Sequence, residues 1–426
     1  MLESKAAVCH LGEIRVHVAC GVCVMAAVYQ PGIYKRAVKG LPLEDWVQDF
    51  KYAKTKGLEM ELYAKKEECC GCGACADVCP VQAIRMERDR EGFDYPYVDT
   101  RVCIRCGRCE DVCPIKNQFS EKCANRYLGA RVKDDKTRYS SSSGGVYPVL
   151  AEYVLARKGV VYGAGYNGRM EVSHRKADSL KQLDDLKRTK YVQSNTQGIF
   201  SDIRQRLEEK RWVLFVGTPC QTRALKLFLG REYDGLIAVD LVCYGVPSPG
   251  IWKNYVRYLE KKYHGKMTDF SFRDKRAGDH GHSYAYVIDG KEHTGSLFRD
   301  RFCIMYFGNY MLRPSCHSCK FCTVDRGSDL TIGDFWGIEK VRPDMDDGMG
   351  TSMVILHTDK AKKIWEQVRK NMDWFECEKD DLMQPRLSGP SGMAKARRLF
   401  MMLYKILPFS FFIRLIDAAI RLFSRR

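Results

Sequence analysis

The sequence predicts an α/β protein in which a small cysteine-rich domain precedes a larger α/β domain with a mostly parallel sheet. Two observations support this fold class. A four-cysteine motif occurs twice within residues 61–118, and two strand–loop–helix units follow one another between residues 212 and 260. Successive units of this kind place their strands side by side and parallel, with helices covering the sheet.

The composition is that of a long globular chain with an unusual amount of cysteine. Its 426 residues suffice for two or more domains, and 45% hydrophobic content is ordinary. The 20 cysteines gather in C-x2-C units, which in a long chain are more typical of metal binding than of a secreted disulfide scaffold. The N-terminal extension, residues 1–60, has an apolar stretch but no clear cleavage site. We therefore expect no cleaved signal peptide and a cytoplasmic protein.

The first domain, residues 61–118, is defined by the spacing C-x2-C-x2-C-x3-C-P, which occurs in "CCGCGACADVCP" and again in "CIRCGRCEDVCP". Three closely spaced thiolates can hold three corners of a 4Fe–4S cluster, while the fourth cysteine binds the other cluster. The Cys69 set is then Cys69, Cys72, Cys75 and Cys113, and the Cys103 set is Cys103, Cys106, Cys109 and Cys79. The segment resembles the bacterial two-cluster ferredoxins, which implies a ferredoxin-like 2[4Fe–4S] domain.

Other roles for these cysteines fit less well. Zinc sites usually have two ligand pairs separated by a finger rather than four cysteines in eleven residues. Disulfides do not suit the expected reducing compartment. Gly71, Gly73 and Gly107 let the backbone turn closely around a cluster, whereas Cys70 has no place in the motif.

The larger domain, residues 119–385, contains the two strand–loop–helix units. The first is a strand at 212–216 and a helix that begins at Pro219, with Thr218 as its N-cap. The second is a strand at 236–242 and a helix from about Pro249. Ligands of parallel sheets bind beyond the carboxyl ends of the strands. Cys220 and Cys243 are therefore expected at one edge of the sheet.

A third cluster is one interpretation of the cysteines at this edge. Cys316 and Cys319 of "CHSCKFC" could join Cys220 and Cys243 as four ligands. Other interpretations are open: a reactive thiolate at Cys220, a core position for Cys243, or zinc bound by "CHSCKFC" with His317 as an extra ligand.

A serine–glycine loop marks a second binding site. "SSSGG" at 141–145 precedes a predicted helix from Val146 that Gly159 closes. Free N–H groups at a helix N-terminus bind anions, although plain N-capping explains the same residues. The G-x-G-x-x-G match at 163–168 lacks the following helix, so we discount a Rossmann site.

The tail, residues 386–426, is basic and amphipathic. From Gly392 onward it has eight Lys/Arg and one Asp, and charged residues and Pro408 interrupt any run long enough to span a bilayer. The pattern favours a helix on an anionic membrane surface, formed by residues 392–426, or a helix docked on the protein itself. Nucleic acid is not an expected partner, because the basic residues are not set among polar, groove-reading ones.

Six motifs of the larger domain resemble the β-subunit family of coenzyme F-420 hydrogenases and dehydrogenases. In order they are "SSSGGVYPVLAEYVLARKGVVYGAGY", "KYVQS", "GTPCQ", "DLVCYGVPSP", "FRDK" and "RPSCHSCKF…DLTIGDFWG". The resemblance covers about residues 124–385. It implies an electron-transfer subunit with FAD and a 4Fe–4S cluster.

Site residues follow from this resemblance. The cluster ligands would be Cys220, Cys243, Cys316 and Cys319, here called the Cys220 set, with Cys322 as a competitor for the fourth position. FAD would be held by the Ser–Gly loop and nearby basic side chains, which are Ser141, Ser142, Ser143, Gly144, Gly145, Lys190, Arg273 and Lys275. Asp334 either orients the flavin or is structural.

The expected function is an iron–sulfur flavoprotein oxidoreductase. It would pass electrons between a hydride donor, coenzyme F-420 or a similar compound, at FAD and a one-electron redox protein or partner oxidoreductase subunit. Flavin permits this because a hydride carries two electrons and each cluster accepts one. The alternatives are a ferredoxin-fed reductase of an organic substrate and a non-catalytic adaptor of cell-surface polysaccharide enzymes. The tail allows a peripheral position on the inner face of the membrane.

Overall fold

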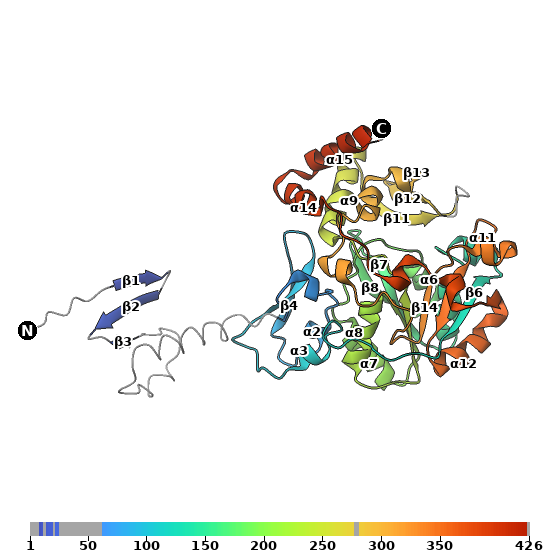
Figure 1. Cartoon of the computed structure of the whole chain (residues 1–426), viewed down its shortest axis with the longest axis horizontal. Helices are drawn as coiled ribbons and strands as arrows, with labels where there is room; N and C mark the ends of the chain where they lie inside the picture. Colours follow the sequence, from blue (N-terminus) through green and yellow to red (C-terminus); the bar gives the residue numbers. More distant parts are fainter. Residues whose placement is uncertain (1–7, 12–13, 20–21, 25–61, 277–280, 424–426) are drawn as a thin grey trace, which may run out of the picture. The chain divides into compact units, whose positions relative to one another are not determined.

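The computed structural model describes residues 8–11, 14–19, 22–24, 62–276 and 281–423 in two compact units, Met1–Glu61 and Leu62–Arg426 (Figure 1). In the first unit, β1 (Val8–Leu11), β2 (Ile14–Ala19) and β3 (Val22–Val24) form an antiparallel sheet. The rest of the predicted N-terminal extension lies outside the described residues. None of the described helices combines the length and apolarity that crossing a membrane requires.

The cysteine-rich segment opens the second unit as two copies of one small motif. Each copy turns into a short helix, α2 (Ala74–Asp77) or α3 (Arg108–Asp111), through a left-handed glycine, Gly73 or Gly107. These glycines have φ of 74° and 77°, values that side chains rarely tolerate. An antiparallel hairpin, β4 (Ile84–Arg88) and β5 (Asp94–Val98), separates the copies.

An eight-stranded sheet forms the larger part of the unit. Its order is β16 (Met372–Glu376), β6 (Arg126–Val132), β15 (Ser352–Leu356), β14 (Leu330–Asp334), β10 (Leu236–Leu241), β9 (Val213–Gly217), β7 (Val160–Tyr166) and β8 (Val172–Ala177). The strands β14, β10, β9 and β7 are parallel, and β6 runs in their direction because two antiparallel pairings separate it from β14. The α/β fold with a mostly parallel sheet is therefore confirmed, and its flanking pairings are antiparallel.

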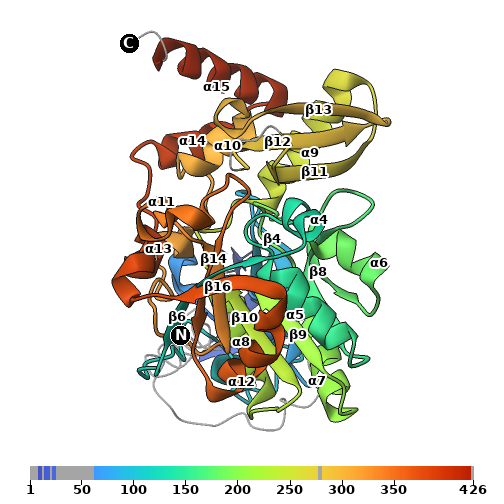
Figure 2. The ribbon, with the colours of Figure 1, turned by 90° about the vertical axis from the view of Figure 1, so that its right-hand side faces the viewer.

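Helices cover both faces of this sheet (Figure 2). Leu214 and Val216 of β9 pack with α5 (Val146–Leu155) and α12 (Asp359–Val368). Phe215, between them, faces the other way, toward α7 (Ile199–Glu208) and α8 (Pro219–Leu229). Alternation of this kind requires a strand that is apolar on both faces, and all five residues of β9 are buried.

The sequence predicts the first residues of two helices to within about one residue of their positions in the structure. The helix α8 begins at Pro219 with Thr218 as N-cap, and α9 (Pro249–Tyr263) begins at Pro249. Gly163 and Gly165 lie inside β7, which continues into a hairpin with β8 rather than a helix. Discounting the dinucleotide-binding fingerprint was therefore correct.

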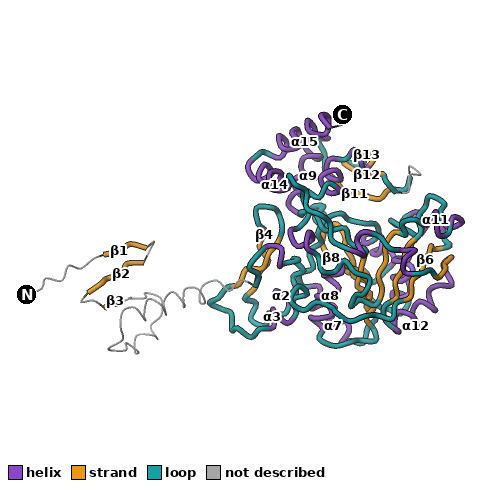
Figure 3. Tube along the Cα trace, viewed as in Figure 1, coloured by secondary structure: helices purple, strands orange, loops and turns teal. Residues whose placement is uncertain are grey.

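The helix α9 and a three-stranded sheet stand at one end of the unit (Figures 1 and 3). An aromatic core lies between them. The sheet consists of β11 (Met267–Asp274), β12 (Ser283–Ile288) and β13 (Lys291–Ser296). Trp252 of α9 packs against Phe270, Phe272 and Phe302 and donates a hydrogen bond from its ring to the carbonyl of Met170.

The tail forms two helices rather than one, α14 (Arg397–Ile406) and α15 (Phe409–Phe423), because Pro408 cannot continue the first. Their inner face is docked, since Phe400 and Phe412 are buried in the aromatic core. Their outer face leaves large apolar side chains 38–67% exposed, which are Leu399, Met402, Ile406, Phe411 and Leu415. The self-docked interpretation thus holds for one face and leaves the other uncovered by the described residues.

Candidate iron–sulfur and cofactor site

Five strands of the large sheet that run in one direction end at the same edge, and four of them lead into residues singled out by the sequence. The Ser–Gly loop, residues 141–145, follows β6 after the short helix α4 (Asp135–Tyr139). Asp334 ends β14, Cys243 follows β10, and Cys220 opens α8 after β9. This is the edge at which open α/β sheets bind ligands.

The Cys220 set comes together at this edge. Burial raises the pKa of the Cys243 thiol, and the neighbouring thiols of Cys316, Cys220 and Cys319 raise it further. Cys316 lies on the short 3-10 helix η4 (Pro314–Ser318), and the N–H of Val246 points to its sulfur at 3.4 Å.

Two neighbours of the Cys220 set bear on the zinc interpretation. The neighbouring thiol of Cys322 lowers the pKa of Cys319 to about 7, so Cys322 lies near enough to compete as a ligand. The imidazole of His317 turns away to the carbonyl of Ser391, with 3.0 Å between nitrogen and oxygen. Among the described residues, no three His, Cys, Asp or Glu side chains are grouped closely enough for one metal ion.

The Cys69 set lines one cavity. Its four members Cys69, Cys72, Cys75 and Cys113 all face this cavity, together with Cys70 and Cys109. Burial raises the pKa of the Cys75 thiol, and the thiols of Cys69, Cys113 and Cys109 add to the effect. Soft sulfur donors around a small cavity fit a 4Fe–4S cluster.

The Cys103 set lies closer to solvent. Cys106 is exposed, and the other three members are half-buried. Val102 and Ile104, on the same loop, are also exposed. The N–H of Ala83 donates to the sulfur of Cys79 at 3.2 Å, a contact that stabilises a thiolate.

Cys70, which the motif leaves without a role, lies between two cysteine sets. The pKa of its thiol is raised: the neighbouring Cys220 thiol lowers it, but Cys72 and burial raise it more. The surrounding loop is held by "KYVQS" and the residues after it. The side chain of Gln193 donates to the carbonyl of Cys70 at 2.9 Å, and Thr196 donates to that of Cys72 at 2.6 Å. Sequence reasoning missed this link because no single segment contains it.

The Ser–Gly loop is tightly seated on the sheet edge. Gly145, with φ of 87°, is the N-cap of α5. A Cβ at Gly144 would lie 2.4 Å from the carbonyl oxygen of Ala130, so only glycine fits there. The hydroxyl of Ser142 accepts from the N–H of Thr189 at 2.8 Å, and Ser143 donates to Thr351 at 3.2 Å. Ser141 donates instead to the carbonyl of Thr137.

The three predicted basic residues differ in how they relate to this loop. Lys275 donates to the carbonyl of Ser143 at 2.8 Å, and burial lowers the pKa of its ammonium to about 8. Arg273 pairs with Asp334 at 2.6 Å, which gives that carboxylate a structural partner. The ammonium of Lys190 turns to the carbonyl of Asp185, and burial lowers its pKa to about 7.

Comparison with known proteins finds relatives of both parts of the chain. Residues 210–380 match the family model for the carboxyl-terminal part of the coenzyme F-420 hydrogenase/dehydrogenase beta chain, and residues 68–117 match that of the 4Fe–4S dicluster domain. One component of the F(420)H(2) dehydrogenase of Methanosarcina mazei is 24% identical over 337 residues, which are 74% of this chain and 86% of the relative. A chain of the F-420-reducing nickel–iron hydrogenase complex of Methanosarcina barkeri is 18% identical, with a TM-score of 0.39 over 68% of this chain and 90% of that one.

Both predicted resemblances are thereby confirmed. Residues 68–117 form a 4Fe–4S dicluster domain, residues 210–380 match the carboxyl-terminal part of the coenzyme F-420 hydrogenase/dehydrogenase β-subunit, and the chain that carries both is an iron–sulfur oxidoreductase.

Proposed function

We propose that this chain transfers electrons between a two-electron hydride donor and a one-electron protein partner. The observation that carries the proposal is the placement of the candidate redox sites. The Ser–Gly loop and the Cys220 set follow strands that end at one sheet edge, Cys70 neighbours both Cys220 and Cys72, and Cys106 is exposed. The proposed path runs through these sites in that order. Each hydride would supply two electrons, which leave in two single transfers, and its proton would pass to solvent.

The cluster ligands proposed here are the three cysteine sets. The Cys69 and Cys103 sets would each hold one 4Fe–4S cluster of the dicluster domain, in the crossed arrangement. The Cys220 set would hold a third. The cavity that Cys69, Cys72 and Cys75 line supports the crossed assignment, because Cys113, the fourth cysteine of the other repeat, lines it too, as does Cys109.

FAD is the cofactor proposed for the Ser–Gly loop. When bound, it would accept a hydride and release electrons singly. The first-turn N–H groups of α5 would face its pyrophosphate, since Gly145 caps that helix without a side chain. Lys275 would supply positive charge from its place beside Ser143. Arg273 is already paired with Asp334, so its part would be to hold that edge of the site.

The proposed hydride donor is coenzyme F-420 or a compound of similar chemistry, and the proposed partner is a redox protein or an oxidoreductase subunit. The name of the Methanosarcina mazei relative, one component of an F(420)H(2) dehydrogenase, supports both proposals. The loop around Cys106 is the proposed surface for the partner, because it brings one cluster to solvent.

The outer face of α14 and α15 is proposed to lie on an anionic membrane surface. Its five exposed apolar side chains are accompanied by exposed Lys395, Arg398 and Arg414. Apolar contact combined with basic charge is typical of interfacial helices.

Iron analysis of double variants tests the crossed ligand sets. Cys113→Ser combined with Cys72→Ser should remove about four irons, no more than either change alone, because both remove ligands of one cluster. Cys113→Ser combined with Cys103→Ser should remove about eight. The reverse pattern would contradict the crossed assignment.

A second iron measurement tests the third cluster. Cys220→Ser together with Cys316→Ser should remove about four irons from anaerobically prepared protein and leave the dicluster signals intact. The matched control is Cys303→Ser, a fully buried cysteine on α10 (Arg301–Phe307) outside all three sets. Unchanged iron in the double variant would exclude the third cluster.

Transient kinetics tests the function and its direction. The purified protein should contain FAD, and a hydride donor should reduce it in Cys72→Ser and Cys106→Ser as fast as in the wild type. The rate of transfer to a one-electron acceptor should fall at least about tenfold, because each change interrupts the cluster series. A tenfold fall corresponds to an activation barrier higher by about 1.4 kcal/mol. If the hydride donor fails to reduce bound FAD while a reduced ferredoxin succeeds, the ferredoxin-fed reductase is the better interpretation.

Vesicle sedimentation tests the tail. The full-length protein should bind phosphatidylserine vesicles and release them with added salt, since each basic residue near the surface adds about 1 kcal/mol. Leu399→Glu with Ile406→Glu should weaken binding, whereas Leu180→Glu, at a 60% exposed apolar position on α6 (Leu180–Leu183), should not. Binding unaffected by the tail changes would argue against a membrane-facing surface.

A further inference from the structure

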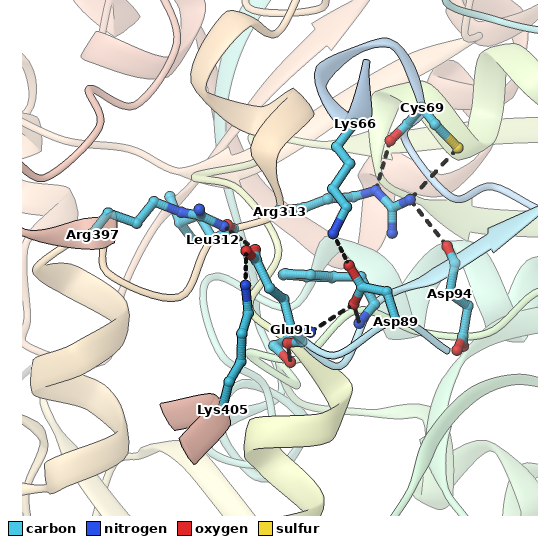
Figure 4. A network of polar contacts seen from close by, with 11 residues as sticks. Lys66, Cys69, Asp89, Glu91, Asp94, Leu312, Arg313, Arg397 and Lys405 are labelled. Carbon is cyan, nitrogen blue, oxygen red and sulfur yellow. Dashed lines mark hydrogen bonds and ion pairs between the residues drawn. The ribbon is translucent and has the colours of Figure 1, made fainter. Parts of the chain in front are cut away.

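Arg313 is a fully buried arginine beside the predicted cluster ligands, with 0% of its surface exposed. Figure 4 shows its guanidinium against the loop that starts at Cys69. It donates to the carbonyl oxygens of Cys69 at 2.7 Å and Asp94 at 3.0 Å, and to the side-chain oxygen of Gln193 at 3.1 Å. One of its terminal nitrogens lies 3.5 Å from the sulfur of Cys69.

The charge of Arg313 has no carboxylate partner among the described residues. The other cations in Figure 4 differ in this respect. Lys66 pairs with Asp89, and both Arg397 and Lys405 pair with Glu91 at 3.0 Å. Asp94 offers Arg313 only its backbone carbonyl, because its carboxylate pairs with Arg88.

A buried cation of this kind needs a counter-charge. Burial lowers the pKa of the guanidinium, and the neighbouring side chains of Cys69, Tyr95, Cys70 and Cys316 raise it. Cys69 belongs to one proposed cluster and Cys316 to another. Arg313 therefore lies between the Cys69 set and the Cys220 set, three positions before Cys316 in the chain.

The loop is shaped to receive this side chain. A Cβ at Gly71 would lie 2.5–2.9 Å from the guanidinium atoms of Arg313. The absence of a side chain at Gly71 thus allows the guanidinium to lie flat on the ligand loop. The ring of Tyr95 covers another side of the guanidinium, whose carbon lies 4.2 Å from the ring centre.

We propose that Arg313 is the counter-ion of the clusters at the Cys69 and Cys220 sets and raises their reduction potentials. The inference rests on the proposed ligation. A fixed positive charge and an N–H donor near a ligand sulfur both favour the reduced, more negative cluster. Arg313 would act electrostatically from its fixed position. It would leave the reduction potential of the cluster at the exposed Cys103 set largely unchanged.

Redox titration followed by electron paramagnetic resonance tests the proposal on full-length, anaerobically prepared protein. In Arg313→Gln, the signals of the Cys69-set and Cys220-set clusters should shift to more negative potential, while that of the Cys103-set cluster keeps its value. In Arg313→Lys, which retains the charge but loses the forked donor, the shift should be smaller. Each signal is assigned by its loss in Cys72→Ser, Cys316→Ser or Cys106→Ser.

Arg397→Gln is the matched control, since it removes a buried cation of the same network that has Glu91 as its partner. It should shift no cluster potential. Unchanged potentials in Arg313→Gln with full iron content would overturn the proposal. If Arg313→Gln loses iron, the iron content of Arg313→Lys decides between the two explanations. Retained iron in Arg313→Lys would support a requirement for the positive charge, and a loss equal to that in Arg313→Gln would overturn the proposal. Failure of the ligation itself would appear separately, as missing iron in the wild type.

Discussion

The hydrogen bonds that join the dicluster loop to the edge of the large sheet are the contacts on which the proposed site depends. Gln193 and Thr196 hold the carbonyls of Cys70 and Cys72, and Cys70 meets Cys220. Without them, the cysteine-rich motif and the sheet edge would be two separate sites. With them, sulfur atoms from residues 69–113 and 220–319 lie in one connected region.

Parallel strand direction explains why that region can be so compact. Because β6, β14, β10 and β9 end at the same edge, the residues that follow them are neighbours in space although the chain separates them widely. The order of the strands also sets the order of the candidate sites along this edge. The Ser–Gly loop lies on the β6 side of β14, and the Cys220 set lies on the β10 and β9 side.

Local signals made part of this structure predictable. The dicluster motif is a fixed spacing of thiols and glycines, and Pro219 and Pro249 mark helix starts through backbone chemistry that acts within a few residues. The antiparallel flank of the sheet has no such signal, since β6 pairs with β15 more than 200 positions away. Arg313 was missed for a related reason. From the sequence alone, a single arginine before Pro314 cannot be told from an ordinary surface arginine. Its contacts with Cys69 and Asp94 exist only in the folded chain.

The contacts of Glu91 and Cys69 have a consequence for how the protein is made. Synthesis delivers the dicluster cysteines early, but Arg313 follows Cys69 by 244 positions, and Arg397 and Lys405 follow Glu91 by 306 and 314. Contacts of such long sequence separation form late, after most of the chain has been ordered. The ribosome therefore exposes bare thiols well before the residues that bury them exist, so shielding of nascent thiols falls to cluster insertion or to the cell's reductants.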